Sequence, residues 1–183
     1  MKTDLRILRT QKAIKDAFII LLSKHPYEKI AVQDIIDTAL VNRATFYRHY
    51  SGKSDLAGKM IHEFKTQVNA LIAERFSGEV GNLSEFVRHM HDKLYQDRHL
   101  MLNLCKIRTP RHHLYDDIHE LTKRHFIAHA TARGVRVDLD YQGEMFATMI
   151  LESGRYFFEQ DKPLVHDVFM QWREIADVLV DGE

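Results

Sequence analysis

The sequence contains few residues of the kinds that break helices or cross-link a chain. Among its 183 residues there are eight glycines, three prolines and one cysteine, Cys105. One cysteine excludes an intrachain disulfide and any site built from clustered cysteines around zinc or iron–sulfur. So little glycine and proline argues against a turn-rich all-β fold and favours long helices.

Long hydrophobic runs are also missing. The longest, Ala17–Leu22, is far too short to cross a bilayer, and the first twelve residues lack the apolar stretch of a signal peptide. We therefore expect a cytoplasmic protein with no membrane partner. With 45% hydrophobic and 28% charged residues, the chain has the composition of a folded globular protein.

The net charge is zero, but the charges are unevenly distributed. Residues 1–53 hold ten Lys and Arg against five Asp and Glu, a net charge of +5, and the remainder carries −5. Such asymmetry is typical of a polyanion-binding segment attached to an acidic body, although a chance fluctuation over fifty residues would give the same count.

Helical periodicity recurs along the whole chain. We expect about nine helices and no strand, an all-α fold. The predicted ranges are 4–24, 32–39, 43–49, 53–76, 83–96, 99–107, 111–133, 138–160 and 165–179. Pro110 is placed to start the seventh of these helices and Gly134 to end it.

The second and third helices are short and separated by only a few residues, which favours a helix-turn-helix. In the third, Asn42 is suited to cap the helix, and Phe46 and Tyr50 can face a core. Arg43, Ala44, Tyr47 and Arg48 would then point outward. Arginine suits guanine edges and phosphates. An ordinary corner between two helices with a solvated basic face is the alternative.

The segment from Ile7 to Phe64 resembles the N-terminal DNA-binding domain of the tetracycline-repressor (TetR) family. The most specific part of the resemblance is the run VNRATFYRHYSGKSDL, from Val41 to Leu56. It implies a helix-turn-helix head over residues 1–53, joined by a connecting helix at about 53–76 to a helical effector-binding and dimerisation domain over 54–183.

The same resemblance implies roles for individual residues. The residues that position the protein on the DNA backbone correspond to Thr45, Tyr47, His49 and Lys53. The residues that contact the groove correspond to Asn42, Arg43, Ala44 and Arg48. Arg6 and Arg9 either reach a minor groove or are solvated arm charges. Gln33 and helix N–H groups are expected to substitute for a phosphate contact that Ala31 cannot make.

Three positions depart from the family's pattern. Ala31 replaces a capping Thr or Ser, a loss of about 1 kcal/mol. Leu40 replaces a glycine, and because leucine adopts positive φ only at a cost, the turn is expected to differ in detail. Gly52 replaces a more polar cap, a mild change.

The last two long helices are the predicted dimer interface, since the 138–160 helix is apolar on two faces. Met145, Met149 and Tyr156 lie on one side of it. The expected interface residues are Gly143, Ala147, Ile150, Gly154, Phe157, Phe169, Trp172 and Ile175. The alternative is that these faces complete the core of a single chain.

An effector site is expected among the helices between 83 and 160, although for each candidate residue taken singly plain core packing is the favoured explanation. The candidates are Met90, Tyr95, Met101, Cys105, Tyr115, Phe126, Met149 and Tyr156. His125 and His129 have a zinc-compatible spacing but lack a completing motif, and Cys105 shows no feature that would lower its pKa. We therefore expect no resident metal or cofactor.

The predicted function is a ligand-responsive transcriptional regulator, most simply a repressor. It would bind a palindromic operator in double-stranded DNA as a homodimer and release it when an unidentified small molecule binds the C-terminal domain. Alternatives are a protein-binding coactivator or adaptor with the same fold, and a metal- or redox-responsive sensor. No nucleophile–base pair or phosphate loop indicates an enzyme.

Overall fold

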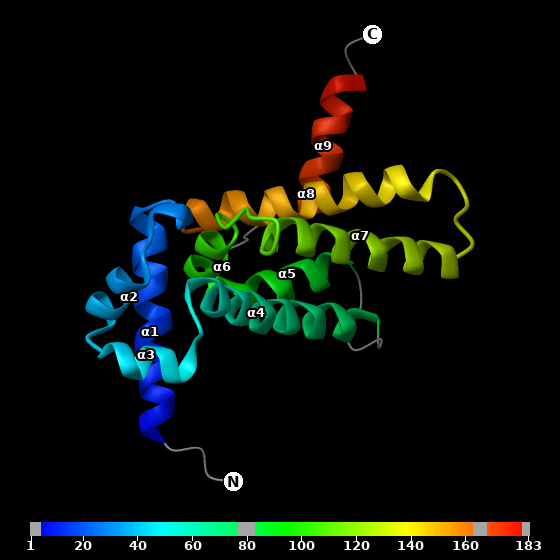
Figure 1. Cartoon of the computed structure of the whole chain (residues 1–183). Coiled ribbons are helices and arrows are strands. Elements are labelled where there is room, and N and C mark those ends of the chain that lie inside the picture. Colours follow the sequence, from blue (N-terminus) through cyan, green and yellow to red (C-terminus); the bar gives the residue numbers. More distant parts are fainter. Residues whose placement is uncertain (1–4, 77–82, 163–167, 181–183) are drawn as a thin grey trace. The chain divides into compact units, whose positions relative to one another are not determined.

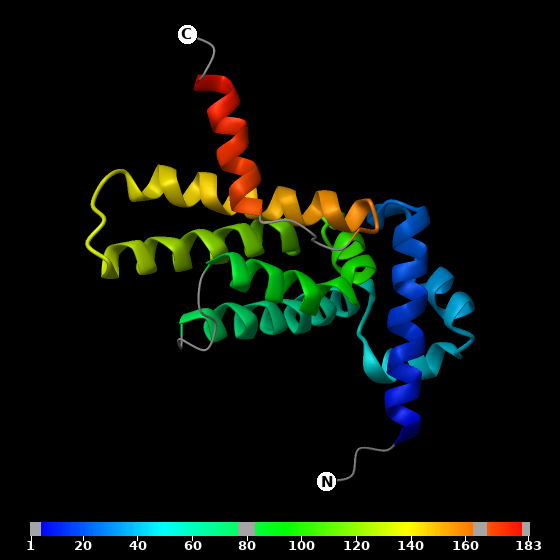
Figure 2. The same ribbon diagram turned by 180° about the vertical axis from the view of Figure 1, so that it is seen from behind.

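The computed structural model describes residues 5–76, 83–162 and 168–180, and in these ranges the chain consists of helices joined by short loops and turns (Figures 1 and 2). The α-helices are α1 (Leu5–Lys24), α2 (Val32–Ala39), α3 (Arg43–His49), α4 (Lys53–Phe76), α5 (Leu83–Tyr95), α6 (Arg98–Leu104), α7 (Leu114–Ala132), α8 (Leu139–Glu159) and α9 (Val168–Val180). A short 3-10 helix, η1 (Tyr27–Lys29), precedes α2. The all-α prediction is confirmed, since the described residues contain one isolated bridge and no strand.

The main error in the predicted boundaries is the start of α7. Pro110 does not open this helix, which begins at Leu114. The Thr109 N–H donates to the His112 carbonyl and the His112 N–H to the Thr109 carbonyl, so residues 109–112 close a tight turn. Proline is favoured at the second position of such a turn because its φ is already correct there. At the other end, Gly134 has φ +79° and ends α7 as expected.

The chain divides into two compact units. The first comprises Met1–Thr66 and His99–Asp116, and the second Gln67–Arg98 and Asp117–Glu183, so the chain passes from one unit to the other inside α4, at the start of α6 and at the start of α7. The first unit is therefore larger than the predicted head of residues 1–53, because the segment around α6 joins it.

The first unit is built around aromatic and branched side chains from α1, the η1 turn, α2, α3 and the start of α4. Phe18 and Phe46 are fully buried, and the Phe18 ring meets the edge of Tyr27 at a centroid distance of 6.3 Å. The predicted apolar stripe of the first helix supplies this core, with Ile14, Ala17 and Leu22 also buried. This packing fixes the direction in which α3 presents its other side.

In the second unit α7 and α8 lie side by side in both views (Figures 1 and 2). A Cβ added to Gly143 would lie 3.0 Å from Ile127 Cγ1, so the glycine allows close approach of α7. Ala147 is completely buried. Gly143 and Ala147 therefore pack within one chain, and the prediction that they face a second copy is wrong for these two residues.

No helix in the described part of the chain combines the length and the apolar character needed to cross a bilayer.

Candidate nucleic-acid interface

Helix α3 has one buried side and one exposed side. Phe46 and Tyr50 are buried and their rings lie 5.8 Å apart, which anchors the helix on the core of the first unit. Arg43, Ala44 and Arg48 are exposed. Tyr47 is 45% exposed, and its ring is held between the edge of Phe46 and the guanidinium of Arg43, at 5.5 Å from the latter. The outward set predicted from the sequence is therefore exposed on one helix.

Asn42 starts this helix as expected. It has extended backbone angles, and its Oδ1 accepts a hydrogen bond of 2.7 Å from the backbone N–H of Thr45. This bond satisfies one of the otherwise unpaired N–H groups of the first turn. Because the oxygen is used inside the helix, only the side-chain NH2 of Asn42 remains to donate to a base edge.

Helix α2 begins without a side-chain cap, as the alanine at position 31 predicts. Asp34 partly compensates, because its Oδ2 accepts a 2.8 Å hydrogen bond from the Ala31 N–H. Gln33 donates to Asp37 on the same helix, and its Oε1 accepts from Arg43 at 3.5 Å. Gln33 thus links the two helices of the motif and holds the Arg43 side chain against α2.

The turn between α2 and α3 keeps a left-handed residue although it lacks a glycine. Leu40 has φ 53° and ψ 41°, with its side chain 91% exposed. The Val41 N–H donates to the Ile36 carbonyl and the Leu40 N–H to the Asp37 carbonyl, the hydrogen-bond pattern of a Schellman ending. Leu40 therefore adopts the left-handed conformation that the family's glycine adopts cheaply, and its side chain extends into solvent.

Lys53 is held by the protein itself. Its Nζ donates to the carbonyl of Tyr27 at 2.6 Å and to that of Ile30 at 2.7 Å, and it lies 4.2 Å from the centre of the Tyr27 ring. Burial lowers the pKa of the ammonium, which the charges of Glu28 and Asp34 partly oppose. Lys53 therefore fastens the start of α4 to the segment preceding α2, and little of its hydrogen-bonding capacity remains for a phosphate.

The remaining predicted positioning residues, Thr45 and His49, are half-buried at the side of α3. The His49 carbonyl accepts a 3.0 Å bond from Lys59, which also pairs with Asp55 at 3.0 Å. Deep burial raises the pKa of Tyr50 to about 12, with the nearby charges of Glu63 and Asp55 adding to the shift, so its hydroxyl stays protonated at neutral pH. The end of α3 is thus fixed by contacts that leave its outer face open.

The predicted effector residues are divided between the two units. Met101, Cys105 and Tyr115 belong to the first unit, and Met90, Tyr95, Phe126, Met149 and Tyr156 to the second. Phe126 stacks on Phe146 at 4.8 Å, and the Tyr95 hydroxyl donates to the Asp161 carbonyl. Met149 and Tyr156 lie on the exposed side of α8, Tyr156 at 55% exposure.

The metal and redox alternatives gain no support from the side chains. Within residues 5–76, 83–162 and 168–180, no group of three His, Cys, Asp or Glu is arranged to hold a metal ion. Burial raises the pKa of the Cys105 thiol to about 12, and the Arg108 charge opposes this only in part. A thiol that is protonated at neutral pH reacts poorly with oxidants, so the redox hypothesis is not favoured.

An apolar stripe remains uncovered along α8 in the single chain. It consists of Tyr141, Met145, Met149 and Tyr156, all exposed. Of the predicted interface residues, Ile150, Gly154, Phe157 and Trp172 are half-buried, Ile175 is exposed, and the side chain of Phe169 lies outside the described residues. The periodicity identified both apolar faces of this helix, but assigned the interface to the face that packs largely within the chain.

Comparisons with known proteins match the segment that contains α2 and α3, the candidate nucleic-acid interface. Residues 14–60 match the family model described as bacterial regulatory proteins, tetR family. The "Uncharacterized HTH-type transcriptional regulator YxbF" of Bacillus subtilis (strain 168) is 41% identical over 59 residues, which are 32% of this chain and 16% of that protein. The "HTH-type dhaKLM operon transcriptional activator DhaS" of Lactococcus lactis is 40% identical over 47 residues, 26% of this chain and 25% of that protein.

Solved structures extend the likeness of fold to nearly the whole chain. The fatty acid degradation regulator FadR from Bacillus halodurans aligns with a TM-score of 0.60 at 16% identity, covering 100% of this chain and 98% of its own. A gamma-butyrolactone receptor aligns with a TM-score of 0.58 at 17% identity, covering 98% and 100%. Such low identity shows the fold alone. The family match and the helix-turn-helix that it covers lead to one conclusion: residues 14–60 form a DNA-binding domain of the type found in the tetR family of bacterial regulatory proteins.

Proposed function

We propose that this protein is a transcriptional regulator that binds a palindromic DNA operator through α2 and α3. In this proposal it acts as a homodimer in the cytoplasm, has no catalytic activity, and represses transcription until a small molecule binds its C-terminal domain. The observation that carries the proposal is the exposed face of α3, in which Arg43, Tyr47 and Arg48 surround Ala44 over a fully buried Phe46.

The chemistry of this face suits the major groove. Two guanidinium groups can bind guanine edges or phosphates through paired hydrogen bonds, and the small Ala44 lets the helix approach closely. The Gln33 and Tyr47 contacts restrict the Arg43 side chain before DNA binds. Less side-chain freedom is then lost on binding, which favours affinity. The net charge of +5 on residues 1–53 supplies long-range attraction to the duplex.

The first test selects operator sequences from a random duplex pool and measures binding of the best one by fluorescence anisotropy at several salt concentrations. Arg43→Ala and Arg48→Ala should each weaken binding about tenfold or more, since a good base contact contributes about 1–3 kcal/mol. Lys93→Ala removes one exposed positive charge outside the helix-turn-helix and should bind as the unmodified protein does. Failure to enrich any duplex at low salt would contradict the proposal.

A second experiment isolates the Tyr47 hydroxyl. Tyr47→Phe keeps the ring contacts to Phe46 and Arg43 but removes a group that can donate to a phosphate. We expect binding to weaken about fivefold on every sequence, because a phosphate contact carries no base information. A change in the selected sequence would instead show that Tyr47 reads bases.

Activation rather than repression is the alternative with a specific observation in its favour. DhaS, which is similar over 47 residues, is named as a transcriptional activator. An activator that works through another protein would keep its effect in a reporter strain when Arg43 and Arg48 are both replaced by alanine. A DNA-bound repressor would lose its effect in the same strain.

A further inference from the structure

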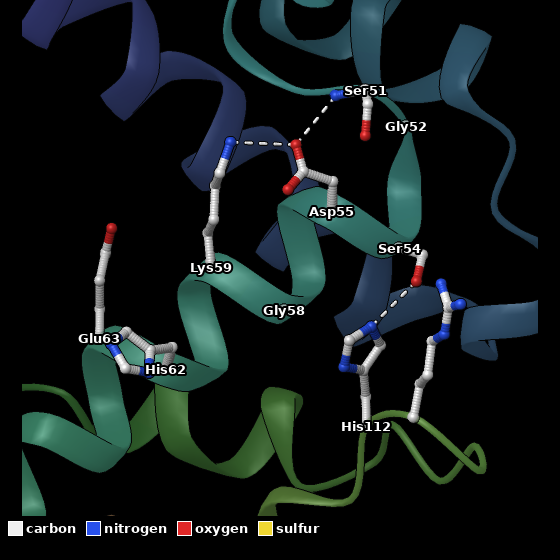
Figure 3. A pocket seen from close by; sticks show the side chains of 10 residues that line it. Ser51, Gly52, Ser54, Asp55, Gly58, Lys59, His62, Glu63 and His112 are labelled. Carbon is white, nitrogen blue, oxygen red and sulfur yellow. Dashed lines mark hydrogen bonds and ion pairs between the residues drawn. The ribbon is translucent and has the colours of Figure 1, made fainter.

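The first unit contains an open pocket of about 600 Å³ beside the start of α4 (Figure 3). Residues 51–63 line one side and residues 111–112, from the turn before α7, line the other. None of the residues that the sequence indicated for an effector lies in its lining. Its volume lies in the range of pockets that bind small metabolites.

His112 closes the inner wall of this pocket. Its Nε2 lies 2.9 Å from the Ser54 hydroxyl, and a Cβ on Gly58 would lie 2.9 Å from His112 Cε1 (Figure 3). The ring therefore packs directly on the bare backbone of α4 at Gly58, which no other residue type would permit without displacing it. This contact ties the 109–112 turn to the first turns of α4.

The carboxylates that line the pocket are already paired. Asp55 accepts hydrogen bonds from the Ser51 N–H and from Lys59, contacts that lower the pKa of its carboxyl group, and Glu63 pairs with Lys15. Arg111 and His62 also line the pocket, and neither side chain takes part in an ion pair within the described ranges. The guanidinium and imidazole are thus available to a ligand, and the charges of the two carboxylates are balanced by Lys59 and Lys15.

We propose that this pocket binds a small organic anion with more than one carboxylate or phosphate group. Arg111 would hold one oxyanion through paired charge-assisted hydrogen bonds, and His62 would donate a hydrogen bond to a second acidic group of the ligand. A single phosphate would leave most of the volume unfilled, so a larger polycarboxylate is the better match. We further propose that a ligand bound in this pocket alters operator affinity, because the start of α4 forms one pocket wall and directly follows α3. This second proposal rests on the proposed DNA-binding function.

Binding is tested on the full chain in the absence of DNA, with citrate as the probe and inorganic phosphate in parallel, by isothermal titration calorimetry at constant ionic strength. Citrate should bind in a saturable manner and more tightly than phosphate. Arg111→Gln should weaken citrate binding at least tenfold, and His62→Gln less. Arg108→Gln, in the same segment but outside the pocket lining, should leave binding unchanged. Equal losses in Arg111→Gln and Arg108→Gln, or no saturable binding of either probe, would overturn the site.

The regulatory part is tested separately with the selected operator duplex. Citrate at constant ionic strength should change the operator Kd at least threefold in the unmodified protein and leave it unchanged in Arg111→Gln. Equal changes in both proteins would reflect salt competition and overturn the regulatory link. If citrate binds but no duplex is ever bound, the pocket stands and the proposed function fails, so the two failures are distinguishable.

Discussion

At the scale of single residues, Leu40 is the position where the chain departs most from local preference. A non-glycine residue at φ 53° costs about 1–2 kcal/mol, and the side chain is too exposed to recover this by packing. Yet the two backbone hydrogen bonds that end α2 depend on this conformation. The fold of the head therefore imposes the left-handed turn on a residue that disfavours it.

Leu40→Gly should accordingly stabilise the protein. Relief of strain outweighs the greater freedom of glycine in the unfolded chain, and we expect a gain of about 0.5–1 kcal/mol in the free energy of unfolding. Urea denaturation monitored by circular dichroism measures it. Leu40→Ala keeps the strain and loses only an exposed side chain, so it should match the parent. A destabilised Leu40→Gly would mean that the leucine makes a contact that this conformation requires.

Asn42 has two possible roles that substitutions can separate. Asn42→Ala removes the oxygen that caps α3 and should cost about 1 kcal/mol of stability. Asn42→Ser keeps a capping oxygen but removes the side-chain NH2. If that group donates to a base, Asn42→Ser should fold with near-normal stability but bind operator several-fold more weakly in the anisotropy assay. Unchanged binding would restrict Asn42 to the cap.

At the scale of helices, the burial of His91 on α5 makes the stability of the protein depend on pH. Its ring lies 4.9 Å from Phe158 of α8 and 5.7 Å from Tyr95, and burial lowers its pKa while the adjacent Asp92 partly opposes the shift. A depressed pKa means that the unfolded chain takes up a proton before the folded chain does. The stability that neutral His91 contributes is complete above about pH 6.5 and is lost as pH falls through the lower folded value.

The thermal midpoint should therefore fall between pH 7.5 and pH 5.5 more steeply in the parent protein than in His91→Phe. Phenylalanine keeps the aromatic packing around Phe158 and cannot titrate. Differential scanning calorimetry at several pH values gives the comparison, and His25→Phe, an exposed position, serves as the control. Identical slopes in the parent and His91→Phe would assign the pH dependence to other groups.

The two glycines of α8 have different surroundings. Side chains of α7 occupy the space beside Gly143, whereas a Cβ at Gly154 would meet nothing within 4 Å. Sequence periodicity treats both as positions open to a partner helix. Only the packing of α7 against α8 distinguishes them.

At the scale of the whole molecule, the exposed apolar residues of α8 and α9 are the strongest argument that the chain works as a dimer. Tyr141, Met145, Met149 and Tyr156 on α8 are joined by Met170, Ile175 and Val178 on α9. A soluble monomer seldom leaves so many large apolar side chains exposed on two successive helices. An exposed apolar face of this kind is suited to a two-fold interface, in which each copy covers the same face of the other.

Ile175→Glu should consequently raise the dimer dissociation constant at least tenfold, because it places a charge on a face expected to lose water. Sedimentation equilibrium measures the constant. Val137→Glu introduces the same change in the segment between α7 and α8, where the side chain is 71% exposed, and should leave association unaffected. An unmodified chain that stays monomeric at micromolar concentration would contradict the proposed dimer.

The sequence by itself determined the helices and the exposed face of α3, because these depend on local periodicity and on caps within a few residues, such as Asn42. It also indicated the tetR-type DNA-binding domain that the family model matches over residues 14–60, since the run from Val41 to Leu56 is contiguous. The tertiary structure alone decided which face of α8 is buried, how residues 109–112 turn, and that Lys53 binds the protein's own carbonyls. The burial of α8 and the contacts of Lys53 depend on partners far away in the chain, as does the packing of His112 on Gly58, and helical spacing carries no information about them.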